Sequence, residues 1–487
     1  MRRALVLITV VLSALQAAAA EPSIRRLDGS LISPAEVDRT IVRLMQAAEV
    51  SGVGISFFNH GKTVYSKAYG FRDVQNKLPL TVDTVMAGAS FTKVAFAYLV
   101  MRLVDEDALD LDKPVQEYLP KPLPDYPGYR DLAEDPRYRK ITARMLLSHT
   151  AGFPNFRWLN EGHKLNINFE PGSRYAYSGE GIQLLQFAVE TITGKPLEVL
   201  MQERVFGALG MSRTSMVSEE RFEDDCANGY DEWGRSLGRP QRTNAAAAGS
   251  IQTTLRDFTV FMQAIIEGKG LRRSTRELML TPQIRILSKH QFPTLSPDTS
   301  SENDAIRLSY GLGWGLYWSP YGKAFFKEGH EDGFRNYTVV FDKPGDGIVI
   351  MTNSSNGEGI FKEILETLQG NTFTPIEWEG FTPHNELPPR KPLPTHTEVV
   401  LDPNLLDRLA GRYAVPPDLI ITVARKGSHL LLQENDEAPG EAVPEAELRF
   451  FSKTSDDVIT FDLDSRGKVL RMVIHTGGRS IPVNKVE

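Results

Sequence analysis

The stretch Met86-Ala87-Gly88-Ala89-Ser90-Phe91-Thr92-Lys93 places a turn of small residues directly before an apolar run that continues to Val104. The run is apolar on nearly every face, which predicts a buried helix. Ser90 stands at the start of this helix, and Lys93 follows three positions later, so both side chains lie on one helical face. The stretch therefore predicts a hydroxyl and an amine in contact at the start of a buried helix.

The two side chains are chemically complementary. A serine hydroxyl needs a base before it attacks, and a lysine held in a desolvated pocket can lose its proton and serve as that base. The free N–H groups and the positive dipole end at a helix start favour a developing oxyanion. We therefore interpret this pair as the core of a serine acyl-transfer site. A second Ser-x-x-Lys at residues 465–468 lies between strand-like runs and predicts a hairpin turn instead.

Length and composition set the broad class. The chain has 487 residues, more than one hydrophobic core usually supports, so we expect two domains. Its hydrophobic and charged fractions, 41% and 24%, are those of an ordinary globular protein. The formal net charge is −7 and no basic cluster stands out, which argues against nucleic acid or an anionic membrane surface as a partner.

Residues 1–20 have two arginines, a short apolar core and an alanine run that offers Ala18-x-Ala20 before Glu21. This pattern predicts a cleavable signal peptide, so we expect a periplasmic or secreted protein without a stable membrane anchor. The single cysteine, Cys226, makes an internal disulfide impossible. It also lacks a basic neighbour that would lower its pKa, so we assign it no nucleophilic role.

The remaining chain divides into three parts. Residues 21–372 contain a capping box at Ser33, a hairpin at 52–69 and later strand-like runs at 312–318, 337–341 and 347–352, closed by a helix at 359–368. Residues 373–397 are dense in proline, which predicts a stiff, extended linker. Residues 398–487 alternate short apolar and polar runs, which predicts a small β-barrel or β-sandwich domain.

Two stretches that follow the Ser90 helix also carry side chains of interest. His149 lies where a short capped helix runs into a glycine loop, and we expect a hydrogen-bonded structural histidine there. Tyr177 lies in a tyrosine-rich turn between glycines, directly before a long amphipathic helix. Such a turn can present a phenol to a pocket, although ordinary turn packing would explain it equally well.

Several motifs in this order resemble the serine β-lactamase-related hydrolases of the class C type. That family includes D-alanyl-D-alanine carboxypeptidases, D-aminopeptidases and penicillin-binding-protein-like esterases. The resemblance covers residues 33–370 and implies an α/β fold of the α+β type, in which helices flank an antiparallel sheet and an all-helical subdomain completes the active site. The tail resembles the small barrel or lipocalin-like β domain that often follows this fold. The motifs are Ser90–Lys93, Leu146–Gly152, Pro171–Gly179, Ala248–Ser250 and Gly329–Phe334.

The resemblance implies a role for each matching residue. Ser90 would be the nucleophile and Lys93 its proton partner, and Tyr177 matches the tyrosine of the Tyr-x-Asn motif and would share the general-base role. His330 is matched to the first residue of the Lys/His-x-Gly motif on the strand that lines the site. The N–H of Ser90 and one from that strand would form the oxyanion hole.

Two departures from the family pattern bear on substrate binding. Gly179 stands where the second motif has asparagine, and Glu180 is the neighbouring candidate to replace that amide. With His330 in the third motif, Asp332 stands where glycine is usual and Gly333 follows it. A buried acid there would repel a substrate carboxylate. We therefore include Gly179, Glu180, Asp332 and Gly333 among the expected substrate-binding residues.

The sequence favours a secreted serine hydrolase that works through an acyl-enzyme on Ser90 and cleaves an ester, a small peptide or a D-amino-acid amide. One alternative is a β-lactamase or D-Ala-D-Ala carboxypeptidase, which needs a carboxylate subsite. Another is a catalytically weak binding or receptor protein of the same fold, which the departure at Gly179 supports. Neither His-Glu-x-x-His nor a pair of Cys-x-x-Cys motifs occurs, so we expect no metal and no cofactor. The expected partner is a small-molecule substrate, and the oligomeric state is left open.

Overall fold

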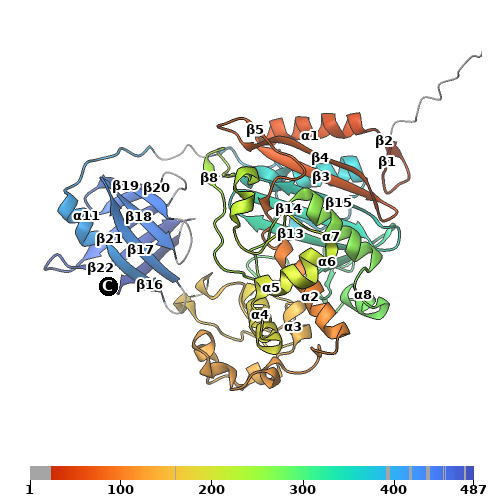
Figure 1. Ribbon diagram of the computed structural model, residues 1–487, viewed down its shortest axis with the longest axis horizontal. Coiled ribbons are helices and arrows are strands. Elements are labelled where there is room, and N and C mark those ends of the chain that lie inside the picture. Colours follow the sequence, from red (N-terminus) through yellow and green to blue (C-terminus); the bar gives the residue numbers. More distant parts are fainter. Residues whose placement is uncertain are drawn as a thin grey trace, which may run out of the picture.

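The computed structural model describes residues 23–159, 161–390, 395–415, 419–434, 439–452, 455, 457–476 and 479–486. The expected signal peptide and residues 391–394 of the expected linker lie outside the described residues. Figure 1 shows a large α+β domain with a small β-barrel beside it. The larger domain is the β-lactamase/transpeptidase-like fold that the motif order predicted.

The main sheet of the larger domain is antiparallel and, within the described residues, holds nine strands in the order β10-β11-β12-β13-β14-β15-β3-β4-β5. The hairpin expected at 52–69 is β3–β4, and the three later runs fall at β12, β14 and β15. The bounds are β3 Gly52–Asn59, β4 Lys62–Asp73, β5 Leu78–Pro79, β10 Ile284–Arg285, β11 Ser309–Tyr310, β12 Gly315–Ser319, β13 Gly322–Glu331, β14 Phe334–Phe341 and β15 Asp346–Thr352.

Successive side chains of a strand point to opposite faces of the sheet, and helices bury both faces. Ile348 and Ile350 of β15 join a cluster with α1 (Pro34–Ala48) and α9 (Phe361–Ile364). Val349 and Met351 join a second, larger cluster with α2 (Phe91–Asp105) and α7 (Leu255–Glu267). The Ser90 helix is thus packed directly against one face of the sheet, as its uniformly apolar sequence predicted.

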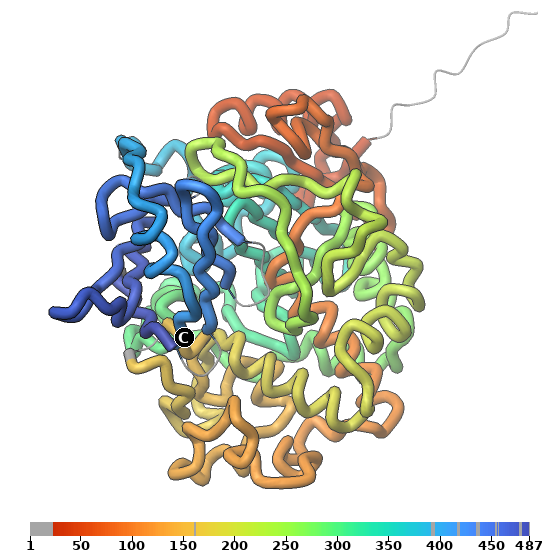
Figure 2. The backbone as a smooth tube through the Cα atoms, turned by 60° about the vertical axis from the view of Figure 1, so that its left-hand side comes forward, coloured from red at the N-terminus to blue at the C-terminus, as the bar shows by residue number. Residues whose placement is uncertain are grey.

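The helical subdomain lies between α2 and the second half of the sheet in the chain, and Figure 2 shows it at the bottom of the molecule. Its helices are α3 Ala143–Leu147, α4 Gly179–Thr193, α5 Leu197–Met201 and α6 Gly207–Leu209, preceded by several short 3₁₀ turns. Short strand pairs link it to the sheet: β6 Met86–Ala87 with β9 Gln252–Thr253, and β7 Gly229–Tyr230 with β8 Ser236–Gly238. Outside it lie β1 Ile24–Arg25, β2 Leu31–Ile32 and α8 Arg273–Met279.

The C-terminal domain is a closed antiparallel barrel whose described residues contribute eight strands. Its core contains Tyr413, Phe450, Phe461 and Met472, and α11 (Pro403–Leu409) adds Leu406. The second Ser-x-x-Lys lies in the turn between β21 and β22, as expected. The strands are β16 Gly411–Val415, β17 Leu419–Lys426, β18 His429–Glu434, β19 Gly440–Ala446, β20 Arg449–Ser452, β21 Val458–Leu463, β22 Val469–Thr476 and β23 Arg479–Lys485.

The expected linker differs from a uniformly extended segment at its beginning. Residues Ile376–Glu379 form a short helix, α10, after Pro375. Ile376, Trp378 and Phe381 are buried in the sheet cluster that also contains α1. The cause is the apolar spacing of these three residues, which outweighs the stiffness that the surrounding prolines predicted. This segment therefore packs as part of the larger domain.

Candidate active site

The turn before α2 is fixed from both sides. The Gly88 N–H donates to the carbonyl of Ile251 at 2.8 Å, and Asn336 Nδ2 on β14 donates to the carbonyl of Ala87 at 3.0 Å. Ala89 has a φ of 48°, a left-handed conformation that costs an L-residue about 1–2 kcal/mol. Ser90 follows as the N-cap residue of α2, and its side chain makes no capping hydrogen bond. The hydroxyl is therefore not used to cap its own helix.

Lys93 reaches this hydroxyl from the first turn of α2. Its Nζ lies 3.1 Å from Ser90 Oγ and 2.5 Å from the carbonyl oxygen of Ala248, in the small-residue run before Ser250. The side chain is 1% exposed. Burial, followed by the positive charge of Lys327, lowers the pKa of Lys93 well below its ordinary value, against the opposing effect of Glu328. Burial thus favours the neutral form of the Lys93 amine, which is the form that can act as a base.

Tyr177 lies on the other side of the pair, directly before α4. Its ring centroid is 5.0 Å from Lys93 Nζ. Burial and the nearby Glu328 carboxylate raise the pKa of Tyr177 well above its ordinary value, while the Ser90 hydroxyl acts in the opposite sense. The ring of the buried His149 packs 4.4 Å from that of Tyr177, centroid to centroid, and its Nδ1 accepts the Ser178 N–H at 3.1 Å. His149 thus has the structural environment that its sequence context indicated.

The cation beside Tyr177 is Lys327. Its Nζ lies 3.1 Å from the Tyr177 phenolic oxygen and 2.5 Å from Glu328 Oε1, and its side chain is fully buried. Lys327-Glu328-Gly329 also fits the Lys/His-x-Gly pattern, with glycine in its proper place. A Cβ added to Gly329 would lie 2.6 Å from the carbonyl oxygen of Gly88, so this strand segment packs against the Ser90 turn. Lys327 is therefore a second candidate, beside His330, for the first residue of the third motif.

His330 lies on the same strand, farther along the pocket wall. Its side chain is 51% exposed, and its Nδ1 is 3.3 Å from Glu358 Oε2. The Glu358 carboxylate also accepts from Arg335 at 2.8 Å. Burial alone would raise the pKa of Glu358, but His330 and Arg335 outweigh it and lower that pKa. His330 is therefore a pocket-wall residue paired with an acid.

The expectation of a buried acid at position 332 also requires correction. Asp332 is exposed at the pocket rim because it lies in the turn between Glu331, the last residue of β13, and Phe334, the first residue of β14. The adjacent Gly333 donates its N–H to Ser355 Oγ at 3.0 Å and packs against Gly229. The acid that is buried beside the reacting pair is Glu328.

Gly179 and Glu180 hold a loop of the helical subdomain in place. The Gly179 N–H donates to Asn155 Oδ1 at 3.0 Å. The buried Glu180 carboxylate takes both Nε and Nη2 of Arg157, at 3.0 and 2.7 Å. Glu180 is thus engaged within the protein and does not line the pocket, whereas Asn155 does. Position 179, where the second motif has asparagine, is glycine and offers no carboxamide. The carboxamide of Asn155 lines the pocket.

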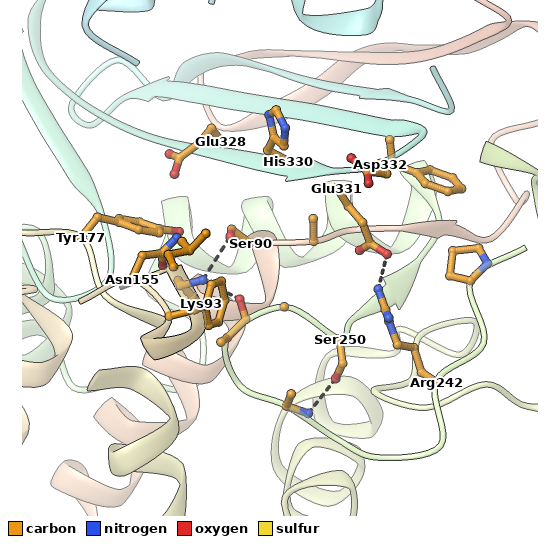
Figure 3. Close-up of a pocket in the computed structure, with 18 of the residues that line it drawn as sticks. Ser90, Lys93, Asn155, Tyr177, Arg242, Ser250, Glu328, His330, Glu331 and Asp332 are labelled. Carbon is orange, nitrogen blue, oxygen red and sulfur yellow. Dashed lines mark hydrogen bonds and ion pairs between the residues drawn. The ribbon is translucent and has the colours of Figure 1, made fainter. Parts of the chain in front are cut away.

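These residues surround a pocket of about 1270 Å³. Figure 3 shows Ser90, Lys93, Tyr177 and Asn155 gathered at one end, with Glu328 above them on the strand. At the other end, Arg242 forms an ion pair with Glu331 across the opening. Ser455 of the barrel also lines this pocket. The site is therefore built mainly from the sheet, the start of α2, the helical subdomain and the loop at 237–250.

No three His, Cys, Asp or Glu side chains of the described ranges form a group able to hold a metal ion. Among the helices of the described part of the chain, none is long and apolar enough to cross a membrane.

Sequence reasoning missed Lys327, Glu328 and Asn155. The signal for Lys327 was present, since the tripeptide at 327–329 also fits the Lys/His-x-Gly pattern and ends in glycine. Asn155 gave no such signal because it lies 24 positions before Gly179 and belongs to a different loop.

The fold and the Ser90–Lys93–Tyr177 group, in which the lysine and the tyrosine are buried, place the chain in the β-lactamase-related class of proteins. A model of the family described as Beta-lactamase matches residues 37–369, and the chain belongs to this family. The chain is 29% identical over 182 residues to a D-aminopeptidase of Brucella anthropi, a match of 36% of this chain and 35% of the relative. It is 29% identical over 232 residues to esterase EstB of Burkholderia gladioli, matching 42% of this chain and 56% of the esterase. The chain thus spans about a third and a little over half of the lengths of these two relatives.

Longer matches occur at lower identity. The D-alanyl-D-alanine-carboxypeptidase/endopeptidase AmpH of Escherichia coli K12 is 26% identical over 367 residues, which cover 69% of this chain and 89% of AmpH. Two solved structures share the fold. The octameric penicillin-binding protein homologue from Pyrococcus abyssi has a TM-score of 0.58 at 21% identity and covers 93% of this chain and all of its own. The D-alanine carboxypeptidase AmpC from Burkholderia cenocepacia has a TM-score of 0.53 at 21% identity, covering 66% of this chain and 93% of its own.

Proposed function

We propose that the protein hydrolyses esters or small amides through an acyl-enzyme on Ser90. The observation that carries this proposal is the 3.1 Å approach of the buried Lys93 amine to the Ser90 hydroxyl. A base with a lowered pKa is what an unactivated serine requires before it attacks. The family membership supports the same class of chemistry.

The proposed reaction has two halves. Ser90 Oγ attacks the substrate carbonyl carbon while its proton passes to Lys93, and the leaving group departs with a proton supplied from the Lys93–Tyr177 pair. Water then attacks the acyl-enzyme, gives its proton to the same pair, and frees the acid product and the Ser90 hydroxyl. General-base assistance of this kind contributes about 10²–10⁴-fold to the rate.

The developing oxyanion would be bound by backbone donors. The N–H of Ser90 at the start of α2 is one proposed donor, and an N–H of β13 is the other. The support is the position of this strand. The pairing of β12 with β13 runs from Gly322 to Phe326, and β13 beyond Phe326 approaches the Gly88 carbonyl. Each such donor is typically worth about 3 kcal/mol of transition-state stabilisation.

Glu328 bears on the choice of substrate. It already neutralises Lys327, the cation next to the reacting pair, at 2.5 Å. A substrate carboxylate at this end of the pocket would therefore meet a paired cation and a buried acid, which disfavours it. We propose that preferred substrates are neutral or carry an amine, as in an alkyl or aryl ester, a small peptide or a D-amino-acid amide. The pattern of residues 1–20 leads us to propose that the mature protein is exported.

One substrate panel tests the proposal. Full-length mature protein and its Ser90→Ala variant would be assayed with p-nitrophenyl esters, D-aminoacyl p-nitroanilides and a chromogenic cephalosporin. We expect turnover of an ester or an aminoacyl amide that disappears in the folded Ser90→Ala variant, and labelling of Ser90 by a fluorophosphonate. Unchanged turnover in that variant would refute the nucleophile. Rapid turnover of the cephalosporin would refute the role given to Glu328.

A further inference from the structure

We propose that Glu379 binds an ammonium group on the acyl side of the substrate, and that this contact selects acyl groups that carry a free amine. The inference rests on the proposed function at Ser90 and names a specificity-determining residue for it. Glu379 is the last residue of α10, in the segment that the sequence predicted as a linker. It lines the same pocket as Ser90.

The first observation is an imbalance of buried charge on one wall of the pocket. Two carboxylates, Glu328 and Glu379, are buried beside one cation, Lys327. Lys327 forms its ion pair with Glu328 at 2.5 Å, and its charge acts on Glu379 as well. Buried charges are normally paired one to one. The wall therefore has room in its charge balance for one further cation.

The second observation is that acceptor oxygens on this wall are unused. Among the described residues, Glu379 Oε1 and Gln291 Oε1 have no hydrogen-bond partner, although their residues are only 4% and 2% exposed. Both residues line the pocket. A buried acceptor without a partner is costly, and an ammonium group carries three N–H donors and no acceptor. A wall that offers acceptors and excess negative charge is complementary to such a group.

The third observation is that the wall is fixed in place. Glu379 Oε2 accepts the Tyr337 hydroxyl at 2.8 Å. Gln291 connects the two acids, because its backbone N–H donates to the carbonyl of Trp378 at 2.8 Å and its Nε2 donates to Glu328 Oε1 at 3.1 Å. A carboxylate held in this way loses little conformational freedom when it binds a ligand.

The electrostatics of Glu379 agree with this assignment. Burial, followed by the charge of Glu328, raises the pKa of Glu379 well above its ordinary value, and Tyr337 and Lys327 act in the opposite sense. A cation in contact with Oε1 would also act in the opposite sense and favour the carboxylate form. An uncharged group at the same place would not.

Paired substrates isolate the effect of the ammonium group. The p-nitroanilides of β-alanine and of butyric acid have acyl groups of equal length, and only the first ends in an ammonium group instead of a methyl group. The pairs glycine with propionic acid and 4-aminobutyric acid with valeric acid give a shorter and a longer chain. Hydrogen bonds between charged groups are stronger than neutral ones. We expect kcat/KM to favour the ammonium member of at least one pair by roughly tenfold or more.

The test substitutes Glu379 in the full chain. Glu379→Gln keeps the shape and an oxygen that can accept from Tyr337, and it removes the charge. We expect it to abolish the preference, mainly through a higher KM for the ammonium substrate, with little change for the methyl substrate. Glu377→Gln is the matched control, since this acid lies on the same helix, is 63% exposed and pairs with Lys362. A preference that persists in folded Glu379→Gln, or that is absent at all three lengths in the wild-type protein, would overturn the proposal.

Binding without turnover separates this proposal from the function on which it rests. In the Ser90→Ala background, n-butylammonium should bind roughly tenfold more tightly than 1-butanol, and adding Glu379→Gln should remove the difference. Equal Kd values for the two ligands would refute the role of Glu379, and this comparison needs no substitution at position 379. Absence of fluorophosphonate labelling of Ser90 in the wild-type protein would refute the proposed function instead.

Discussion

The Nζ atom of Lys93 lies 3.1 Å from Ser90 Oγ and 2.5 Å from the carbonyl oxygen of Ala248. The carbonyl takes one N–H of the amine, so the remaining lone pair of a neutral lysine can face the hydroxyl. Burial is the main reason that the pKa of Lys93 is lowered. The contact with Ala248 therefore orients the amine, and burial favours its use as a base.

Replacing Lys93 by arginine tests this arrangement. Lys93→Arg keeps a long basic side chain, but a guanidinium does not lose its proton in proteins, so it cannot serve as the base. We expect kcat/KM for a p-nitrophenyl ester to fall by roughly 10²–10⁴-fold, with fluorophosphonate labelling slowed in parallel. Circular dichroism and the melting temperature would verify that the variant is folded. A folded variant with near-normal turnover would exclude Lys93 as the base.

The pH dependence of kcat/KM should depend on the charges of Lys327 and Glu328, which lie near Lys93. Because the reactive form is deprotonated and its pKa is lowered, kcat/KM should rise with pH and level off well below the ordinary lysine pKa of 10.5. The effect of Lys327, which lowers this pKa, exceeds that of Glu328, which raises it. Replacing both, Lys327→Met with Glu328→Gln, should raise the pKa of Lys93 and move the acidic limb to higher pH.

An exposed ion pair with one positive and one negative side chain provides the control for that experiment. Arg273 and Glu277 form an ion pair at 2.8 Å on the surface of α8, with side chains 92% and 58% exposed. Arg273→Met with Glu277→Gln also removes one charge of each sign, and it should leave the acidic limb in place. A limb that stays in place in the Lys327–Glu328 variant as well would show that these charges do not tune the base.

The contact between the strand and the nucleophile turn can be tested at Gly329. A Cβ there would lie 2.6 Å from the Gly88 carbonyl oxygen, so Gly329→Ala must push the turn that carries Ser90. A displacement of about 1 Å in a reacting group costs on the order of 10²-fold in rate, and we expect kcat to fall by that amount with little change in KM. Gly128→Ala is the matched control because nothing lies within 4 Å of a Cβ at that position. Similar kcat values for the two variants would contradict the proposed packing role.

Much of the fold was predictable from local pattern. The apolar run after Ser90 predicted a buried helix, and alternating residues predicted the strands of the main sheet and of the barrel, because both signals depend on burial of one or more faces. The helix at Ile376–Glu379 was missed because the dense prolines around it predicted an extended segment. Its apolar residues are buried only by contact with the larger domain, which is distant in sequence. Tertiary packing, which local sequence does not encode, decided that segment.

The site was predictable where its residues share one element and less so where they do not. Ser90 and Lys93 are separated by one helical turn, so their contact follows from spacing. Lys327 was overlooked as a candidate for the third motif, although glycine at position 329 completes the Lys/His-x-Gly pattern there. Asn155 and Arg157 meet Gly179 and Glu180 only through the folding of two loops. No spacing rule connects those pairs.

The ion pair between Arg157 and Glu180 should also be important for stability. Both side chains are nearly fully buried, at 9% and 6% exposure, so Glu180→Gln would remove one charge from a desolvated ion pair. Breaking such a pair typically costs about 3–5 kcal/mol of unfolding free energy. Lys195 and Glu203 form a pair at 2.6 Å with both side chains about half exposed, and Glu203→Gln should cost about 0–1 kcal/mol. Urea unfolding of the full chain, followed by tryptophan fluorescence, would compare the two variants. Equal costs would mean that the loop carrying Asn155 is held by its backbone contacts and not by this pair.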